Sequence, residues 1–104
     1  MRIFVYTLVS LILCSELSAQ VVPASPKVEK VFDGGAFLEG PAAAPDGSIY
    51  FSDITNPATT GMQVGHIWRY DPRTGKSTIF RSPSGQSNGL EFDAAGRLVA
   101  VEGD

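Results

Sequence analysis

Alternation of apolar and polar positions dominates the chain downstream of residue 31. It is clearest in three short runs: residues 48–52 (SIYFS), 66–70 (HIWRY) and 76–80 (KSTIF). β-Branched and aromatic residues are frequent in them, as in half-buried strands. No segment after residue 20 has convincing helical periodicity. The pattern therefore predicts an all-β fold with a strand in each run.

Turn-forming residues separate these runs. Pro45-Asp46-Gly47 precedes the first run, and residues 71–75 (DPRTG) lie between the second and the third. Pro fixes φ, Asp bonds to its own backbone, and Gly reaches positive φ without a steric penalty. We therefore expect residues 66–70 and 76–80 to form an antiparallel hairpin.

The chain also contains an internal repeat. Residues 40–53 (GPAAAPDGSIYFSD) align without gaps on residues 89–102 (GLEFDAAGRLVAVE), an offset of 49 residues (89 − 40). Two glycines coincide, and each copy ends its strand on a carboxylate. A repeat of about 40–50 residues with four short strands is the size of one β-propeller blade. A sandwich or small barrel also has short strands but requires no such match, so the repeat favours a propeller.

A closed propeller needs more sequence than this chain has. Rings typically contain about 4–8 blades, and 104 residues hold fewer than two copies of the repeat. Each blade packs on its neighbours, so a partial ring leaves blade faces uncovered. We therefore expect an N-terminal fragment, either a natural truncation or a partial gene product, unless the chain assembles with others.

The first nineteen residues have the pattern of a secretory signal peptide. Arg2 is followed by an uncharged apolar run over residues 3–14, and a polar segment then ends in Ser18-Ala19. A membrane anchor would need about twenty apolar residues, and a lipid-modified Cys14 would be preceded by small residues that are missing here. We predict export to the periplasm or medium, with residues 1–19 as signal, residues 20–31 as a Pro-containing linker and residues 32–104 as the partial propeller.

The charge and the cysteine content of the chain exclude several classes of binding partner and disulfide stabilisation. Eight Lys and Arg oppose eleven Asp and Glu, for a net charge of −3, and the charges are scattered. Nucleic-acid binding would need clustered basic residues, and no basic amphipathic stretch suits a membrane surface. Cys14 is the single cysteine, so disulfides would not stabilise the mature chain. We expect no nucleic-acid partner and no stable membrane span after signal cleavage.

The repeat places two polar residues at equivalent positions. Glu39 precedes Gly40 in the first copy, and Asn88 precedes Gly89 in the second. Carboxylate and amide oxygens suit a hard cation such as Ca²⁺. A solvated loop carboxylate and an ordinary Asn-Gly turn are the alternatives. Asp53 and Glu102 end matching strands and are candidates for supporting hydrogen bonds around such a site.

In their order and spacing, several motifs resemble those in the first blades of the regucalcin and gluconolactonase family. Members of this family are six-bladed β-propellers of the senescence marker protein type. The resemblance covers roughly residues 32–103 and rests on residues 37–41 (FLEGP), 45–54 (PDGSIYFSDI), 67–72 (IWRYDP) with Gly75, 88–93 (NGLEFD) and 96–98 (GRL). It implies a metal-dependent hydrolase of sugar lactones, with Glu39 as a metal ligand and Asn88 as a substrate contact. The cation would be Ca²⁺, with Zn²⁺, Mg²⁺ or Mn²⁺ as alternatives.

Two departures qualify what the resemblance implies. The family has an arginine two residues before the asparagine, where this chain has Gln86, which leaves the lactone unspecified. The remaining ligands and the catalytic base belong to later blades, so we expect the chain by itself to be inactive. The alternative function is a non-catalytic propeller that binds a ligand or partner, because a fold does not fix a function.

Overall fold

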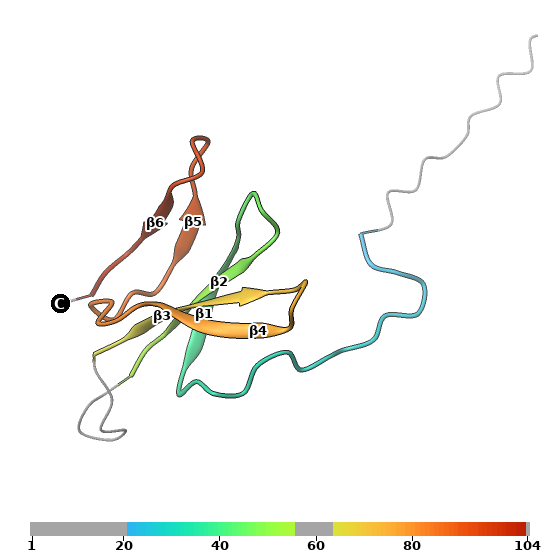
Figure 1. The fold of residues 1–104 in the computed structure, drawn as a ribbon, viewed down its shortest axis with the longest axis horizontal. Coiled ribbons are helices and arrows are strands. Elements are labelled where there is room, and N and C mark those ends of the chain that lie inside the picture. The colour runs from blue at the N-terminus through green and yellow to red at the C-terminus, as the bar shows by residue number, and fades with distance from the viewer. Residues whose placement is uncertain (1–20, 56–63, 104) are drawn as a thin grey trace, which may run out of the picture.

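The computed structural model describes residues 21–55 and 64–103, so the predicted signal peptide lies outside the described residues. These two ranges contain six strands and no helix, arranged as two antiparallel sheets (Figure 1). The strands are β1 (Leu38–Ala43), β2 (Ile49–Asp53), β3 (His66–Asp71), β4 (Lys76–Arg81), β5 (Leu90–Phe92) and β6 (Leu98–Ala100). The all-β prediction is confirmed, and the three predicted strands appear as β2, β3 and β4. Within the described ranges we find no helix that is long and apolar enough to cross a bilayer.

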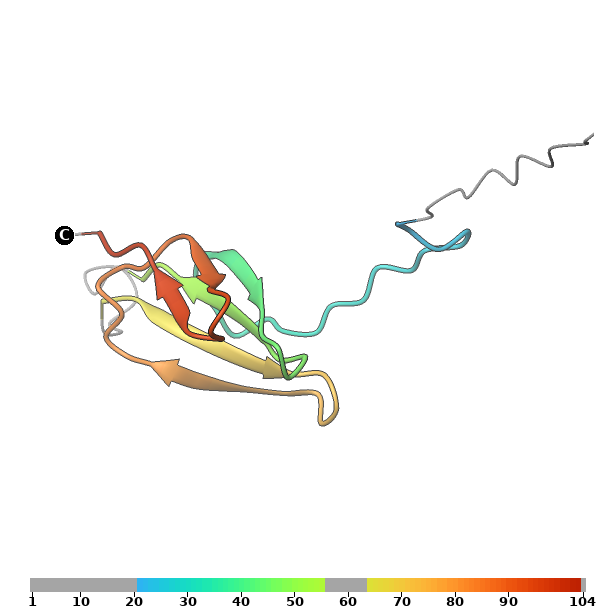
Figure 2. The ribbon, with the colours of Figure 1, turned by 90° about the horizontal axis from the view of Figure 1, so that it is seen from above.

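The first sheet is a meander of four strands in the order β1-β2-β3-β4, and the second is the β5-β6 hairpin. β2 and β3 pair without interruption from Ile49↔Tyr70 to Asp53↔His66. The predicted hairpin between β3 and β4 forms, with Asp71 paired to Lys76 across the turn. Residues 21–37 precede the first sheet without a strand, and Figure 2 shows their N-terminal part extending away from it.

A β-bulge interrupts the pairing of β1 with β2. Glu39 is opposite Ser52, and Ala42 is opposite Tyr50, so β1 has one more residue than β2 between these pairs. Gly40 lies in the bulge with φ of +59°, a backbone conformation that favours glycine. The extra residue therefore falls directly after Glu39.

The second hairpin reproduces the first at the level of single hydrogen bonds. Ala44 N–H donates to the Ser48 carbonyl at 2.8 Å, and 49 residues later Asp93 N–H donates to the Arg97 carbonyl at 3.0 Å. The strand pairs shift by the same offset, with Ala43↔Ile49 recurring as Phe92↔Leu98. The internal repeat is therefore a repeat of structure as well as of sequence.

The core lies between the two sheets and is small. Ala42, Ile67 and Leu90 are its buried apolar residues, and Tyr50, Phe92, Leu98 and Ala100 pack against them. The Tyr50 ring meets Phe92 edge-on, with centroids 5.3 Å apart. These contacts hold the second hairpin against one face of the first sheet.

The opposite face of the first sheet is covered in part by Phe32. The centroid of its ring lies 5.3 Å from that of Phe51 and 4.8 Å from that of Trp68. Apolar side chains thus occupy both faces of the first sheet, one facing the second hairpin and the other facing the segment before β1.

Candidate functional site

The Glu39-Gly40 and Asn88-Gly89 dipeptides meet where the two hairpins touch. A Cβ atom added to Gly40 would overlap the carbonyl oxygen of Asn88 and lie 3.3 Å from Gly89 Cα. The two backbones can approach this closely because Gly40 has no side chain. The structure therefore brings Glu39 and Asn88 to adjacent backbone positions.

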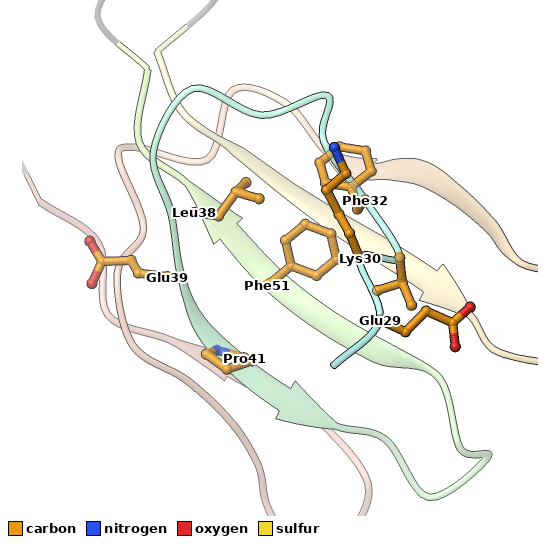
Figure 3. A pocket seen from close by; sticks show the side chains of 8 residues that line it. Glu29, Lys30, Phe32, Leu38, Glu39, Pro41 and Phe51 are labelled. Carbon is orange, nitrogen blue, oxygen red and sulfur yellow. The ribbon is translucent and has the colours of Figure 1, made fainter. Parts of the chain in front are cut away.

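Among the described residues, the side chains of Glu39 and Asn88 have no hydrogen-bonding or ion-pairing partner. Glu39 is half-buried, and Asn88 is exposed. The Asn88 backbone is fixed, because its N–H donates to the Val101 carbonyl at 2.9 Å. The Glu39 carboxylate points away from Phe32 and Phe51 (Figure 3). Their oxygens are free to bind a ligand.

A cluster of buried serines joins the hairpins beside these two residues. Ser52, which pairs with Glu39, has its Oγ 3.1 Å from the Oγ of Ser87, the residue before Asn88. Ser87 N–H donates to Ser84 Oγ at 3.4 Å. All three serines are 0% exposed. Sequence reasoning missed this cluster, although Ser52 and Ser87 each adjoin a repeat position that it had singled out.

Asp53 uses its whole carboxylate within the fold. It is 0% exposed, and its Oδ1 accepts hydrogen bonds from the N–H groups of Ala36 at 3.0 Å and Phe37 at 2.9 Å. Its Oδ2 accepts one from Trp68 Nε1 at 3.2 Å. Asp53 thus fastens the segment before β1 to the first sheet, and no described contact links it to Glu39.

Glu102 has a different environment from Asp53 despite the matching position. Its Oε1 forms an ion pair of 2.6 Å with Arg81 Nη1, and 44% of its side chain is exposed. Exposed pairs of this kind contribute little to stability. Glu102 links the end of the second copy to β4 and makes no described contact with Asn88.

His66 is buried at the start of β3. Its Nδ1 lies 2.8 Å from Ser82 Oγ, and its Nε2 is buried without a hydrogen-bond partner. The contact with Ser82 involves no second metal-ligating side chain. Among the residues that the structure describes, no three His, Cys, Asp or Glu side chains form a group able to hold a metal ion.

The carboxylates with shifted pKa values lie in turns, away from Glu39. Hydrogen bonds from the Ser48 backbone, from the Arg73 side chain and from the Arg97 backbone lower the pKa values of Asp46, Asp71 and Asp93, respectively. Each hydrogen bond favours the ionised form. All three carboxylates accept backbone hydrogen bonds within turns, as the Asp46-Gly47 and Asp71-Pro72 patterns predict for the first two.

A hollow of about 350 Å³ lies between β1, β2 and the segment before β1 (Figure 3). Its walls are largely apolar and are formed by Glu29, Lys30, Val31, Phe32, Leu38, Glu39, Pro41 and Phe51. This size and composition suit a small, mostly apolar molecule. The hollow lies on the face of the first sheet that carries Phe51. Glu39 is among its lining residues, but the carboxylate of Glu39 points away from Phe51 (Figure 3).

No protein-family model matches the chain, and no curated protein or solved structure matches it significantly.

Proposed function

We propose that this chain forms the N-terminal part of an exported, metal-dependent sugar-lactone hydrolase built as a β-propeller. The observation that carries the proposal is the close approach of Gly40 to Asn88, which places Glu39 and Asn88 side by side. The motif resemblance to gluconolactonases assigns complementary roles to these same two residues.

The strand order supports a propeller. Four consecutive strands form a meander, and the repeat restarts in a second hairpin that packs on the face of the first. Blades of a propeller are four-stranded antiparallel sheets that pack face to face around an axis. In this arrangement β1 and β5 would be the innermost strands of neighbouring blades, with Glu39 and Asn88 at the channel.

The donor set at this place fits a hard divalent cation. Glu39 offers a carboxylate that makes no hydrogen bond or ion pair with a described residue, and Asn88 offers an amide oxygen on a backbone that is hydrogen-bonded to Val101. Ca²⁺ takes about 6–8 oxygen ligands, so further ligands must come from water, substrate or residues outside the described ranges. When bound, such a cation would polarise the lactone carbonyl.

The chain's own residues would bind and orient rather than transfer protons. Glu39 would hold the cation, and the Asn88 amide would hydrogen-bond to a polar group of the lactone. No residue here is assigned as the base, and we propose that it lies outside this chain. We therefore expect no lactone hydrolysis by the isolated chain.

Paramagnetic line broadening tests the metal site. Adding Mn²⁺ to the isotope-labelled chain should broaden the amide resonances of Gly40, Asn88 and Gly89 before others. Glu39→Gln should abolish this local broadening. Glu91→Gln, which changes an exposed carboxylate on β5, is the matched control and should retain it. Local broadening that survives Glu39→Gln would contradict the assignment.

A non-hydrolysable sugar lactam tests the substrate contact. In the presence of Ca²⁺ it should shift the side-chain amide resonances of Asn88, and Asn88→Ala should weaken lactam binding. Shifts that ignore Ca²⁺ and centre on Phe51 would instead favour the second candidate, a non-catalytic ligand-binding propeller. The apolar hollow beside Phe51 is the observation that favours this alternative.

A further inference from the structure

The Asn88 side chain is exposed, and the residue that follows it is glycine. Its amide group makes no hydrogen bond with a described residue. The next backbone nitrogen, that of Gly89, is also unoccupied, because within residues 21–55 and 64–103 its N–H donates to no acceptor. An electrophilic side-chain carbon and an unbonded N–H therefore belong to neighbouring residues.

The peptide group that joins Asn88 to Gly89 is held only from its two ends. The Asn88 N–H donates to the Val101 carbonyl at 2.9 Å, and the Gly89 carbonyl accepts from the Val101 N–H at 3.0 Å. Gly89 has no side chain, and a Cβ atom added to it would have nothing within 4 Å. The Gly89 nitrogen is thus unhindered by its own residue and by its surroundings.

Sequence and structure together distinguish this position from similar ones. Asn56, the other asparagine, precedes Pro57, which has no N–H with which to react. Asp46-Gly47 has the same spacing of a short polar residue and a glycine, but the Gly47 N–H donates to the Ala44 carbonyl at 2.9 Å. A bonded N–H must leave its acceptor before it can attack, whereas the Gly89 N–H has none to leave.

We infer that Asn88 is a site of spontaneous deamidation. The Gly89 nitrogen attacks Cγ of Asn88, so that an N–Cγ bond forms and the Cγ–Nδ2 bond breaks. The proton of the Gly89 N–H leaves with Nδ2 as ammonia. Water then opens the cyclic imide, either at Cγ to give aspartate or at the main-chain carbonyl carbon to give isoaspartate. The balance is water consumed and ammonia released, with no oxidant or reductant.

The reaction adds a negative charge where the two copies of the repeat meet. Gly40 approaches the Asn88 carbonyl closely, so the new carboxylate would arise at the backbone position adjacent to Glu39. Affinity for a divalent cation such as Ca²⁺ depends on the number of charged ligands. Deamidation to aspartate should therefore tighten cation binding. This effect rests on the proposed function, whereas the modification itself rests only on Asn88 and Gly89.

Peptide mapping of the full chain measures the reaction. After incubation in neutral buffer, trypsin releases residues 82–97, which contain Asn88, and mass spectrometry should show aspartate and isoaspartate forms of this peptide accumulating. Gly89→Ala should slow the conversion at least about tenfold, because the added methyl group hinders the attack. Gly75→Ala, in the turn between β3 and β4, is the matched control and should leave the rate unchanged.

A synthetic peptide of residues 82–97 decides the question on the unmodified chain, in case Gly89→Ala disturbs the fold. Nothing restrains Asn88 and Gly89 in this peptide. The folded chain, monitored by its Trp68 fluorescence, should convert at a rate within about tenfold of the peptide. A slower rate would show that the fold protects Asn88 and would overturn the inference. Conversion in Gly89→Ala as fast as in the unmodified chain would overturn it too.

Mn²⁺ titrations separate the modification from the metal site. Asn88→Asp reproduces the aspartate product and should bind Mn²⁺ at least about tenfold more tightly than the unmodified chain. Conversion of Asn88 without tighter binding by Asn88→Asp would keep the deamidation site and contradict the metal site at Glu39. Tighter binding without conversion would overturn the deamidation site and leave the metal site standing.

Discussion

The hydroxyl groups of Ser52 and Ser87 lie 3.1 Å apart in a buried contact between the two copies of the repeat. Ser52 is opposite Glu39 in the sheet, and Ser87 precedes Asn88. A single hydrogen bond therefore couples the backbones that position both candidate site residues.

This coupling is measurable by a double-mutant cycle. Ser52→Ala and Ser87→Ala should each destabilise the fold, because each leaves a buried hydroxyl without its partner. The double variant should lose less than the sum, with an interaction energy of about 1 kcal/mol. Urea unfolding followed by the fluorescence of Trp68, the only tryptophan, gives the four free energies. Additive losses would show that the contact contributes nothing.

Gly40→Ala should be the most damaging small substitution in the first hairpin. The new Cβ would overlap the Asn88 carbonyl oxygen, a backbone atom that cannot rotate away. Gly75→Ala is the control, because Gly75 has a similar φ of +68° and nothing within 4 Å of an added Cβ. We expect a loss of about 1 kcal/mol for Gly75→Ala from backbone strain and about 3 kcal/mol or more for Gly40→Ala. Equal losses in the two variants would argue against the close approach of the hairpins.

Asp53→Asn should destabilise the chain by about 2 kcal/mol, since an amide nitrogen cannot accept the hydrogen bond from the Trp68 indole. The loss should appear together with a change in Trp68 fluorescence in the folded state. Asp33→Asn removes an exposed carboxylate paired with Lys30 and should change stability by only a few tenths of a kcal/mol. An Asp53→Asn chain as stable as the Asp33→Asn control would exclude the fastening role of Asp53.

Lowering the pH should reduce the stability of the fold, because the turn carboxylates become protonated. The pKa values of Asp71 and Asp93 are lowered in the folded chain by hydrogen bonds from Arg73 and Arg97. A depressed folded-state pKa stabilises the fold at pH values above the unfolded-state pKa, and this stabilisation is lost as the pH falls through the folded-state pKa. The urea midpoint should therefore drop as the pH falls below about 4. The drop should be smaller in the Asp71→Asn, Asp93→Asn double variant, and an identical pH profile would show that these turns do not contribute.

Local sequence pattern predicts much of this fold. β3 and β4 begin where alternation predicts, at His66 and Lys76, because a tight turn between alternating runs allows few other pairings. The offset of 49 residues correctly relates β5-β6 to β1-β2, since equal spacing of glycines and turn residues gives equal backbone geometry.

The contacts around the site were less predictable because they join distant segments. Asp53 bonds to residues 16 and 17 positions earlier, and Ser52 bonds to Ser87, 35 positions later. Nothing in the alternation of β2 distinguishes a carboxylate that ends a strand from one that fastens a neighbouring segment. The repeat does predict that the backbones around Glu39 and Asn88 lie close together, because it relates these two distant positions directly.

The bulge after Glu39 determines on which face of the first sheet the Glu39 carboxylate lies. Glu39 and Ala42 are three residues apart, and strict alternation would send them to opposite faces. Their partners Ser52 and Tyr50 are two residues apart and share a face of the sheet. The inserted residue therefore places Glu39 on the same face as Ala42, toward the second hairpin. Without the inserted residue, the Glu39 carboxylate would lie on the same face as Phe51 and Trp68, where burial among apolar rings would be destabilising.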